Sequence, residues 1–356
     1  MLHLNTGLIR FPSETGLTIY WGCVVKKIEF LIGGIRSCLK SRRRLARRAV
    51  MFSLLASLVV SPDAVPMVMG AVVPPFESEI IDQWGGMQRP SRIAITESGR
   101  IYVSDSGRGV VAIFDSEGTR VGTLTGVDAP LGLAVSGLNR CIDFLGCSCP
   151  WVSTAYVGSE LDGSVSVFEN GRLARMIGAG AGEFIKPNGI AVTREQVVYV
   201  VDSETKNVKI FGPDGRLEST FGLTGWEWYP VDIALNETTG ELYVADYLNG
   251  SIEVFDFDGV WLRYFLAPDN DQGDPAFFRI AGLGIGPSGN LHVVDNALAS
   301  VTTLTPDGAL IDIVGYQLGS YWTGELNVPI DAATNGSSLY VTSSKDRLVK
   351  VFEVAQ

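Results

Sequence analysis

The chain has 356 residues, with 39 acidic and 28 basic side chains and a formal net charge of −11. This acidity argues against a nucleic-acid ligand, because a phosphate backbone is bound by a basic surface. Apolar residues make up 46% of the chain and 41 residues are glycine, which is the composition of a globular protein with many turns.

The first 75 residues differ in composition from the rest. They contain ten Lys and Arg against three acidic residues, and a basic segment at 41–48 is followed by an apolar run at 49–60. This order is typical of a signal peptide, and the run is shorter than the about 20 residues that a membrane span needs. We therefore expect export, to the periplasm, to the extracellular space or to the outer side of the cytoplasmic membrane. The alternative is a retained N-terminal anchor, which would be the chain's only link to a membrane.

Residues 76–356 form the second part of the chain, and we expect them to fold as one domain. They hold 18 of the basic and 36 of the acidic side chains, so removal of the leader strengthens the case against nucleic acid. Short apolar runs separated by turn residues recur throughout this part. The stretch 189–222 contains four such runs, and Val, Ile, Tyr and Phe dominate them, which predicts four β-strands.

The same unit recurs six times. An aromatic residue or His marks the second strand of each unit, at intervals of 43 to 54 residues: Tyr102, Tyr156, Tyr199, Tyr243, His292 and Tyr340. An apolar residue lies twelve positions after each of them, in the third strand: Phe114, Phe168, Phe211, Phe255, Leu304 and Phe352. A period of this length with four strands per unit predicts an all-β fold, a six-bladed β-propeller of four-stranded antiparallel blades.

The third unit carries a recognisable motif. It consists of Pro-x-Gly-Ile-Ala-Val at 187–192, Tyr-Val-x-Asp-Ser at 199–203, Val-x-Ile-Phe at 208–211 and Asp-Gly at 214–215. This pattern resembles the NHL repeat, and the resemblance covers about residues 76–356. It implies a six-bladed propeller that serves as a binding or protein-interaction scaffold more often than as an enzyme. Units two and six depart from it, with Ser159 and Ser343 in place of the Asp.

The last unit ends after its third strand. A segment before the first unit, 79–85, resembles the fourth strands of other units. We expect this N-terminal strand to complete the last blade, because ring closure removes an exposed sheet edge. A closed ring of this kind is expected to be a monomer.

The second unit contains an insertion of about 16 residues at 136–151, which includes Cys141, Cys147 and Cys149. After export these thiols would enter an oxidising compartment, where a disulfide is favoured. We expect one disulfide, from Cys141 to Cys147 or Cys149, and one free thiol. Reduced structural cysteines and a metal site remain alternatives, although the spacing matches no standard zinc pattern.

The candidate binding site lies where the first strands begin. Alignment of the six units brings together Arg92, Asn188, Asp232 and Asp331 at one mouth of the channel. Three aromatic residues precede the strand that contains Asp232, and we expect them to rim this mouth: Trp226, Trp228 and Tyr229. Mixed charges and aromatic side chains suit a small polar ligand or a loop of a partner protein. The alternative is an ion pair from Arg92 to one of the two Asp residues that only joins blades.

The residues of the propeller bear on three classes of enzyme. The element Pro187-Asn188-Gly189 resembles one in calcium-dependent lactonase and gluconolactonase propellers, which implies Ca²⁺ held by oxygen ligands at the channel mouth. Arg92 disfavours a metal there, and we expect no cofactor in the preferred interpretation. The chain has only two histidines, and we expect His292 to be a packing residue in a strand, so a zinc lyase or a Ser–His–Asp hydrolase is not favoured.

Overall fold

The computed structural model describes residues 80–138, 152–178, 183–224, 227–266, 277–315, 317–318, 321–322 and 326–353. The leader, the three cysteines of the insertion and Trp226 lie outside these residues. No helix within the described ranges is long and apolar enough to cross a membrane.

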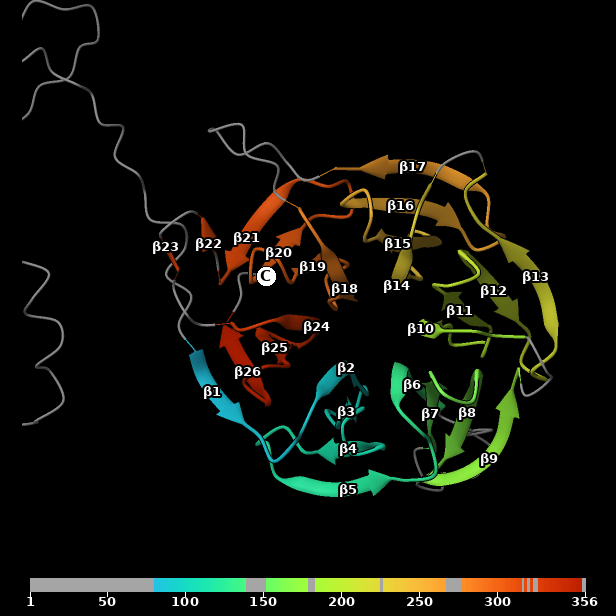
Figure 1. Ribbon diagram of the computed structural model, residues 1–356, viewed down its shortest axis with the longest axis horizontal. Coiled ribbons are helices and arrows are strands. Elements are labelled where there is room, and N and C mark those ends of the chain that lie inside the picture. The colour runs from blue at the N-terminus through green and yellow to red at the C-terminus, as the bar shows by residue number, and fades with distance from the viewer. Residues whose placement is uncertain are drawn as a thin grey trace, which may run out of the picture. The chain divides into compact units, whose positions relative to one another are not determined.

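The described residues form six four-stranded antiparallel sheets arranged in a ring around a central channel (Figure 1). The innermost strands of blades one to six are β2 (Pro90–Ile95), β6 (Pro130–Leu138), β10 (Pro187–Val192), β14 (Pro230–Asn236), β18 (Ile280–Ile285) and β24 (Pro329–Asn335). The second strands are β3 (Ile101–Asp105), β7 (Val152–Ser159), β11 (Val198–Asp202), β15 (Glu241–Asp246), β19 (Leu291–Asp295) and β25 (Ser338–Ser343). The predicted all-β, six-bladed propeller is confirmed.

The third strands are β4 (Val110–Phe114), β8 (Ser164–Glu169), β12 (Asn207–Phe211), β16 (Ser251–Asp256), β20 (Ser300–Leu304) and β26 (Leu348–Glu353). The outer strands are β5 (Arg120–Leu124), β9 (Arg172–Ile177), β13 (Leu217–Phe221), β17 (Trp261–Phe265), β21 (Leu310–Val314) and, for blade six, β1 (Ile80–Trp84). A two-stranded sheet, β22 (Gln317–Leu318) with β23 (Tyr321–Trp322), lies between blades five and six in the chain.

The N-terminal strand closes the ring as predicted. β1 pairs antiparallel with β26, from Ile80 opposite Phe352 to Trp84 opposite Val349. Trp84 also packs on Phe114 of blade one, with ring centroids 4.4 Å apart. The first described strand therefore joins the last blade to the first and leaves no third strand exposed at the end of the sheet.

A separate apolar cluster fills each junction between neighbouring blades. The cluster between blades six and one, for example, contains Ile101 and Val103 from one blade and Val349 from the other, all fully buried. β-Branched and aromatic residues alternate along the strands, so each strand contributes to the junctions on both of its sides. This packing fixes the innermost strands and thereby the side chains that point into the channel.

In blades one, three, four and five, an Asp at the end of the second strand accepts hydrogen bonds from the segment that leads into the innermost strand. Asp105 accepts hydrogen bonds from the amides of Gln88 and Arg89, and Asp202 does the same for Ile185 and Lys186. In blades two and six, a Ser with an Asp three residues later replaces it, as in Ser159–Asp162 and Ser343–Asp346. The carboxylates of Asp105 and Asp202 therefore bond to backbone amides at the entry to their own blades, and in blades two and six the hydroxyls of Ser159 and Ser343 contact the backbone there instead.

Candidate functional site

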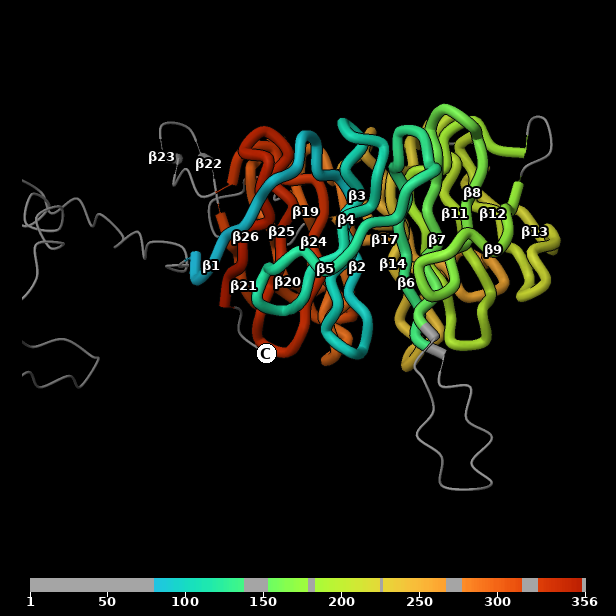
Figure 2. The backbone as a smooth tube through the Cα atoms, turned by 90° about the horizontal axis from the view of Figure 1, so that it is seen from below, coloured from blue at the N-terminus to red at the C-terminus, as the bar shows by residue number. Residues whose placement is uncertain are grey.

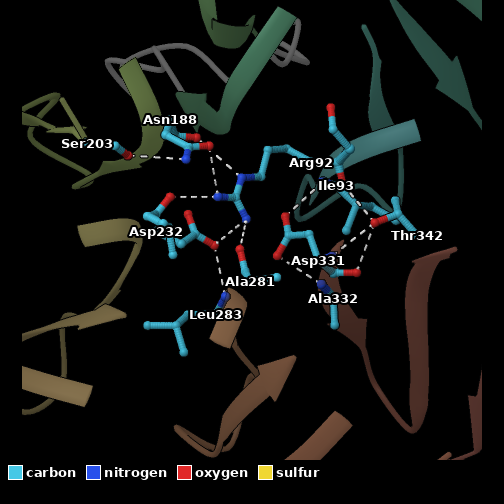
Figure 3. Close-up of polar contacts among 12 residues, drawn as sticks. Arg92, Ile93, Asn188, Ser203, Asp232, Ala281, Leu283, Asp331, Ala332 and Thr342 are labelled. Carbon is cyan, nitrogen blue, oxygen red and sulfur yellow. Dashed lines mark hydrogen bonds and ion pairs between the residues drawn. The ribbon is translucent and has the colours of Figure 1, made fainter. Parts of the chain in front are cut away.

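The ring has two faces, seen edge on in Figure 2. We call the face where the innermost strands begin the upper face, and the face where they end the lower face. The four polar residues aligned from the sequence lie at the upper end of the channel, and we call Arg92, Asn188, Asp232 and Asp331 the charged layer. Figure 3 shows that they do converge, from blades one, three, four and six.

Arg92 extends from blade one across the channel to the opposite blades (Figure 3). Its Nη1 donates to Asp232 Oδ2 at 2.9 Å and to the carbonyl of Ala281 at 2.8 Å. Its Nη2 donates to Asn188 Oδ1 at 3.2 Å and to the carbonyl of Val231 at 2.7 Å. Nε donates to the Asn188 carbonyl at 3.3 Å. All five N–H groups of the guanidinium therefore have partners within the chain.

The charged layer is buried as well as bonded. The side chains of Arg92 and Asp232 are 4% and 6% exposed. Replacement of either partner of such a buried ion pair destabilises the fold, because the remaining buried charge is left without compensation. The bonds favour the interpretation of Arg92 and Asp232 as a brace between blades. That the layer binds a ligand stays a prediction, to be tested by whether substitutions change affinity or only stability.

Each carboxylate of the layer also holds the next blade. Asp232 Oδ2 accepts the amide of Leu283 at 2.8 Å, and Asp331 Oδ2 accepts the amide of Ile93 at 3.0 Å. Both amides belong to innermost strands, on edges that face the channel. Burial raises the pKa of Asp331 well above its ordinary value, and the neighbouring Asp232 raises it further. Burial raises the pKa of Asp232 too, against the opposing effect of Arg92.

Glycine occupies the same strand position in the blades that contribute no charge to the layer. A Cβ on Gly189 would lie 2.6 Å from the Cα of Asp232, and one on Gly282 would lie 2.7 Å from Asp331 Oδ1. Neither contact is possible without movement of the backbone or the carboxylate. Glycine at these two positions therefore provides the space in which the charged side chains meet.

Two of the three aromatic residues predicted to rim the upper mouth, Trp228 and Tyr229, are among the described residues, and they differ in burial. Trp228 is 1% exposed and packs in the cluster between blades three and four, where its indole N–H donates to the Lys206 carbonyl at 3.1 Å. Tyr229 is partly buried, and its hydroxyl donates to Glu204 at 2.9 Å. Trp228 is thus a core residue, whereas Tyr229 lies near the surface of the upper face.

A calcium ion does not fit the charged layer as it is arranged. Two oxygens that would coordinate it, Asn188 Oδ1 and Asp232 Oδ2, accept hydrogen bonds from Arg92. The Arg92 guanidinium thus already binds the oxygens that a calcium ion would need as ligands. Among the described residues, no group of three or more His, Cys, Asp or Glu side chains is arranged to hold a metal ion.

His292 lies in the second strand of blade five and is 3% exposed. Its Nδ1 is 3.0 Å from Thr303 Oγ1, and burial lowers its pKa to about 4. The imidazole is therefore neutral at ordinary pH. This placement in a strand agrees with the expected packing residue.

The lower end of the channel contains a cavity of about 290 Å³, which the sequence did not single out. Polar residues at the ends of the innermost strands and just after them line it: Thr96, Glu97, Ser136, Thr193, Arg194, Asn236, Glu237 and Thr238. A second space of about 210 Å³ adjoins it and extends toward Asp232 and Asp331. The two share an aliphatic waist, formed by Ile95, Val135, Val192, Leu235 and Ile285. Alignment of the sixth and following residues of each innermost strand would have identified this lining.

Comparison with known proteins supports the fold and leaves the family open. No family model matches the chain. The protein brain tumor of Drosophila melanogaster is 24% identical over 143 residues, which are 39% of this chain and 13% of that protein. The chain thus spans only a small part of this relative.

Solved structures show the same architecture at low identity. A protein of unknown function from Bacteroides thetaiotaomicron has a TM-score of 0.59 and 15% identity, over 78% of this chain and 72% of that one. Virginiamycin B lyase from Staphylococcus aureus has a TM-score of 0.52 and 11% identity, over 77% of this chain and 88% of the lyase. At such identities the likeness extends to the fold alone.

Proposed function

We propose that the protein is an exported NHL-type propeller that acts as a binding scaffold for a partner protein. The NHL-like repeat motif and the local match to the brain tumor protein support the family. The basic and apolar segments of the leader support export. The observation that carries the proposal is an arc of exposed apolar side chains on the upper face.

The arc extends over blades two to five. Leu161 is 76% exposed, Ile185 and Leu248 are each 57% exposed, and Phe278 is 56% exposed. Each belongs to a turn between second and third strands or to a segment that precedes an innermost strand. Both kinds of segment lie at the upper face.

Contacts between residues next to these side chains link the arc between blades two and three and between blades four and five. Lys186 Nζ, next to Ile185, is 3.5 Å from Glu160 Oε1, next to Leu161. Tyr229 packs edge-on against Tyr247 at 6.4 Å, and the Arg279 guanidinium lies 5.9 Å from the Tyr247 ring. Exposed apolar side chains accompanied by aromatic and Arg side chains are typical of protein interfaces. A partner with its own apolar side chains is the ligand that such a surface suits best.

A photo-crosslinking experiment in the native cell tests this proposal. A photoreactive amino acid is placed at Phe278 or Leu248, and at the exposed Thr239 of the lower face as the matched control. We expect one common partner to be crosslinked from the first two positions and not from Thr239. Equal crosslinking from all three positions, or none from Phe278 and Leu248, would overturn the proposal.

The proposed export has its own test. Cleavage after the apolar region would give a mature protein that begins between about Pro66 and Phe76. N-terminal sequencing of protein from the native cell measures this directly. A cytoplasmic protein that begins at residue 1 would contradict export and leave the binding proposal in place.

An enzymatic role has weaker support. One structure similar to this chain is that of a catalytically inactive virginiamycin B lyase in which a histidine is replaced by alanine. In the described part of this chain the one histidine, His292, is buried in a strand. A calcium-dependent lactonase would need Arg92 to leave Asn188 and Asp232. Lactone hydrolysis that is lost on chelation of calcium would favour that class over a scaffold.

A further inference from the structure

The channel below the charged layer is a space with one closed and one open end. Arg92 crosses the upper end, and two adjoining spaces of about 210 Å³ and 290 Å³ lie below it. Asp232 and Asp331 line the first of these spaces. The aliphatic side chains of the waist line both spaces and are half-buried, so they face open volume. A slender molecule that enters from the lower face can therefore reach the two carboxylates.

Asp331 is a buried carboxylate without a cationic partner. It is 5% exposed, and its two oxygens accept the amides of Ile93 and Ala332. None of the ion pairs among the described residues includes it, and all five N–H groups of Arg92 go to other acceptors (Figure 3). A carboxylate can accept about four hydrogen bonds, so acceptor sites of Asp331 are left over. Because a buried charge without a partner is unfavourable, a cation from the channel would complete this group.

The lower rim has the same composition of charges as the charged layer. Glu97, at the end of blade one, is exposed, lines the lower space and takes part in no ion pair of the described residues. Glu237 lines this space as well, but it pairs with Arg194. Each end of the space therefore has two carboxylates and one guanidinium, which is one negative charge in excess. Between the two ends the wall is aliphatic.

We propose that the channel below the charged layer binds a linear diamine, with one ammonium group at Asp331, the methylene chain in the waist and the other ammonium group at Glu97. An ammonium group donates three hydrogen bonds and accepts none, which matches carboxylates that have free acceptor sites. A neutral ligand would leave both excess charges uncompensated, and an anion would be repelled at both ends. This site goes beyond the scaffold function and lies at the opposite end of the channel from the proposed protein-binding face.

The positions along the strands set the length of the ligand. Asp331 is the third residue of β24, and Glu97 is at the eighth position counted from the start of β2 in the neighbouring blade. Five residues of extended strand span about 16 Å. A hydrogen bond of about 3 Å at each end leaves about 10 Å between the two nitrogens. An extended eight-carbon diamine has this length, whereas a four-carbon diamine is too short to reach both carboxylates.

Binding at Asp331 should also release a proton. Burial raises the pKa of Asp331 well above its ordinary value and the neighbouring Asp232 raises it further, against the opposing effect of Arg92. Without a ligand the carboxyl group therefore retains a proton to a higher pH than an exposed Asp does. An ammonium group beside it favours the charged form and displaces that proton. A ligand that bound at the rim alone would not have this effect.

Isothermal titration calorimetry of the full chain tests the site. The protein is titrated with 1,8-diaminooctane at about 0.15 M salt, which screens binding to the exposed acidic surface. We expect saturable binding of one diamine per chain, with a binding enthalpy that differs between buffers of different ionisation enthalpy because a proton is released. 1,8-Octanediol has the same length and no charge and should show no saturable binding. 1,4-Diaminobutane should bind at least about tenfold more weakly.

Three variants locate the two ammonium groups. Glu97→Gln should weaken the eight-carbon diamine about threefold, as expected for an exposed charge. Glu117→Gln is the matched control, since it removes the same charge from an exposed turn of the same blade and the same face, between β4 and β5, and it should bind as the wild type does. Asp331→Asn should weaken binding at least about tenfold and abolish the proton release. If Asp331→Asn does not fold, the comparison of diamine with diol on the wild type decides the same point.

The proposal is overturned if 1,8-diaminooctane shows no saturable binding to the folded protein, or if the diol binds as tightly as the diamine. It is also overturned if 1,4-diaminobutane binds as tightly as the longer diamine, or if Glu97→Gln and Glu117→Gln have equal affinities. Each of these failures leaves crosslinking from Phe278 and Leu248 unaffected, so it is distinguishable from a failure of the proposed scaffold function.

Discussion

The two ends of the channel each contain an arginine–carboxylate pair, and the two pairs differ in burial far more than in distance. At the upper end Arg92 Nη1 lies 2.9 Å from Asp232 Oδ2, with side chains 4% and 6% exposed. At the lower end Arg194 Nε lies 3.1 Å from Glu237 Oε2, with side chains 78% and 27% exposed. The same chemistry serves as a brace between blades at one end and as a solvated rim at the other. The contribution of such an ion pair to stability therefore depends on its burial and on the number of further hydrogen bonds that its members make.

Loss of the upper pair should have the largest effect. Arg92→Ala leaves Asp232 buried without its cation and removes five hydrogen bonds, so we expect the free energy of unfolding to fall by about 3–5 kcal/mol. Urea denaturation followed by tryptophan fluorescence measures it. The double variant Arg92→Met with Asp232→Leu, which removes both charges, should recover part of the loss. An unchanged unfolding midpoint for Arg92→Ala would show that the brace does not stabilise the ring.

The effect of burial on a titratable group can also be tested at His292, which is 3% exposed in the second strand of blade five. Its pKa is about 4 in the folded protein. An unfolded His has a pKa of about 6.5, so the unfolded state binds a proton in this window that the folded state does not. Stability is therefore fully present above pH 6.5 and is lost as the pH falls toward 4, by up to about 3 kcal/mol. The His292→Gln variant should lack this part of the pH dependence in urea titrations between pH 7 and 4; parallel profiles would contradict it.

The contact between blades six and one at the upper end can be tested by substitution of Thr342. Its fully buried Oγ1 accepts the amide of Asp331 at 3.0 Å and donates to the Ser91 carbonyl at 2.7 Å. Thr342→Val keeps the shape and leaves that amide without a partner, which should cost about 2 kcal/mol. Thermal unfolding monitored by circular dichroism would detect this change. Thr238→Val, at an exposed turn of the lower face, is the control and should leave the melting temperature as it is.

The exposed pair should show the smallest effect. Arg194→Ala removes an ion pair that water and salt already screen, and we expect a loss below about 1 kcal/mol. The effect should decrease further when urea denaturation is repeated at high salt. If Arg194→Ala lowered the free energy of unfolding as much as Arg92→Ala does, burial would not explain the difference between the two ion pairs.

Much of the fold was predictable because each blade repeats the same physical requirements. The twelve-residue step from Tyr199 to Phe211 recurs in every unit, and so do the turns that separate the strands. The closing strand was predictable as well, since blade six lacked a fourth strand and an outer-strand pattern stood before blade one. The first residues of the six innermost strands meet at the axis, so the sequence predicts that Arg92, Asn188 and Asp232, each the second or third residue of its strand, come together.

What could not be predicted depends on exact backbone positions. Three of the five bonds of Arg92 go to the carbonyls of Asn188, Val231 and Ala281, and no sequence pattern reports where a carbonyl points. Trp228 was expected at a rim and is buried, because a Trp two residues before a strand can turn into the junction or away from it. Thr334 of β24 was within reach of sequence reasoning, because it is a polar residue at the strand position where the other five blades contribute Ile, Val or Leu to the waist.

The most direct test of the brace is a pair of double-mutant cycles, one at each end of the channel. Arg92→Ala and Asp232→Ala are combined in one cycle, and Arg194→Ala and Glu237→Ala in the other, with free energies of unfolding measured in urea. We predict a coupling energy above about 2 kcal/mol for the buried pair and below about 0.5 kcal/mol for the exposed pair. A coupling energy below about 0.5 kcal/mol for Arg92 and Asp232 would contradict the account, because burial would then give this ion pair no larger stabilising effect than the exposed pair has.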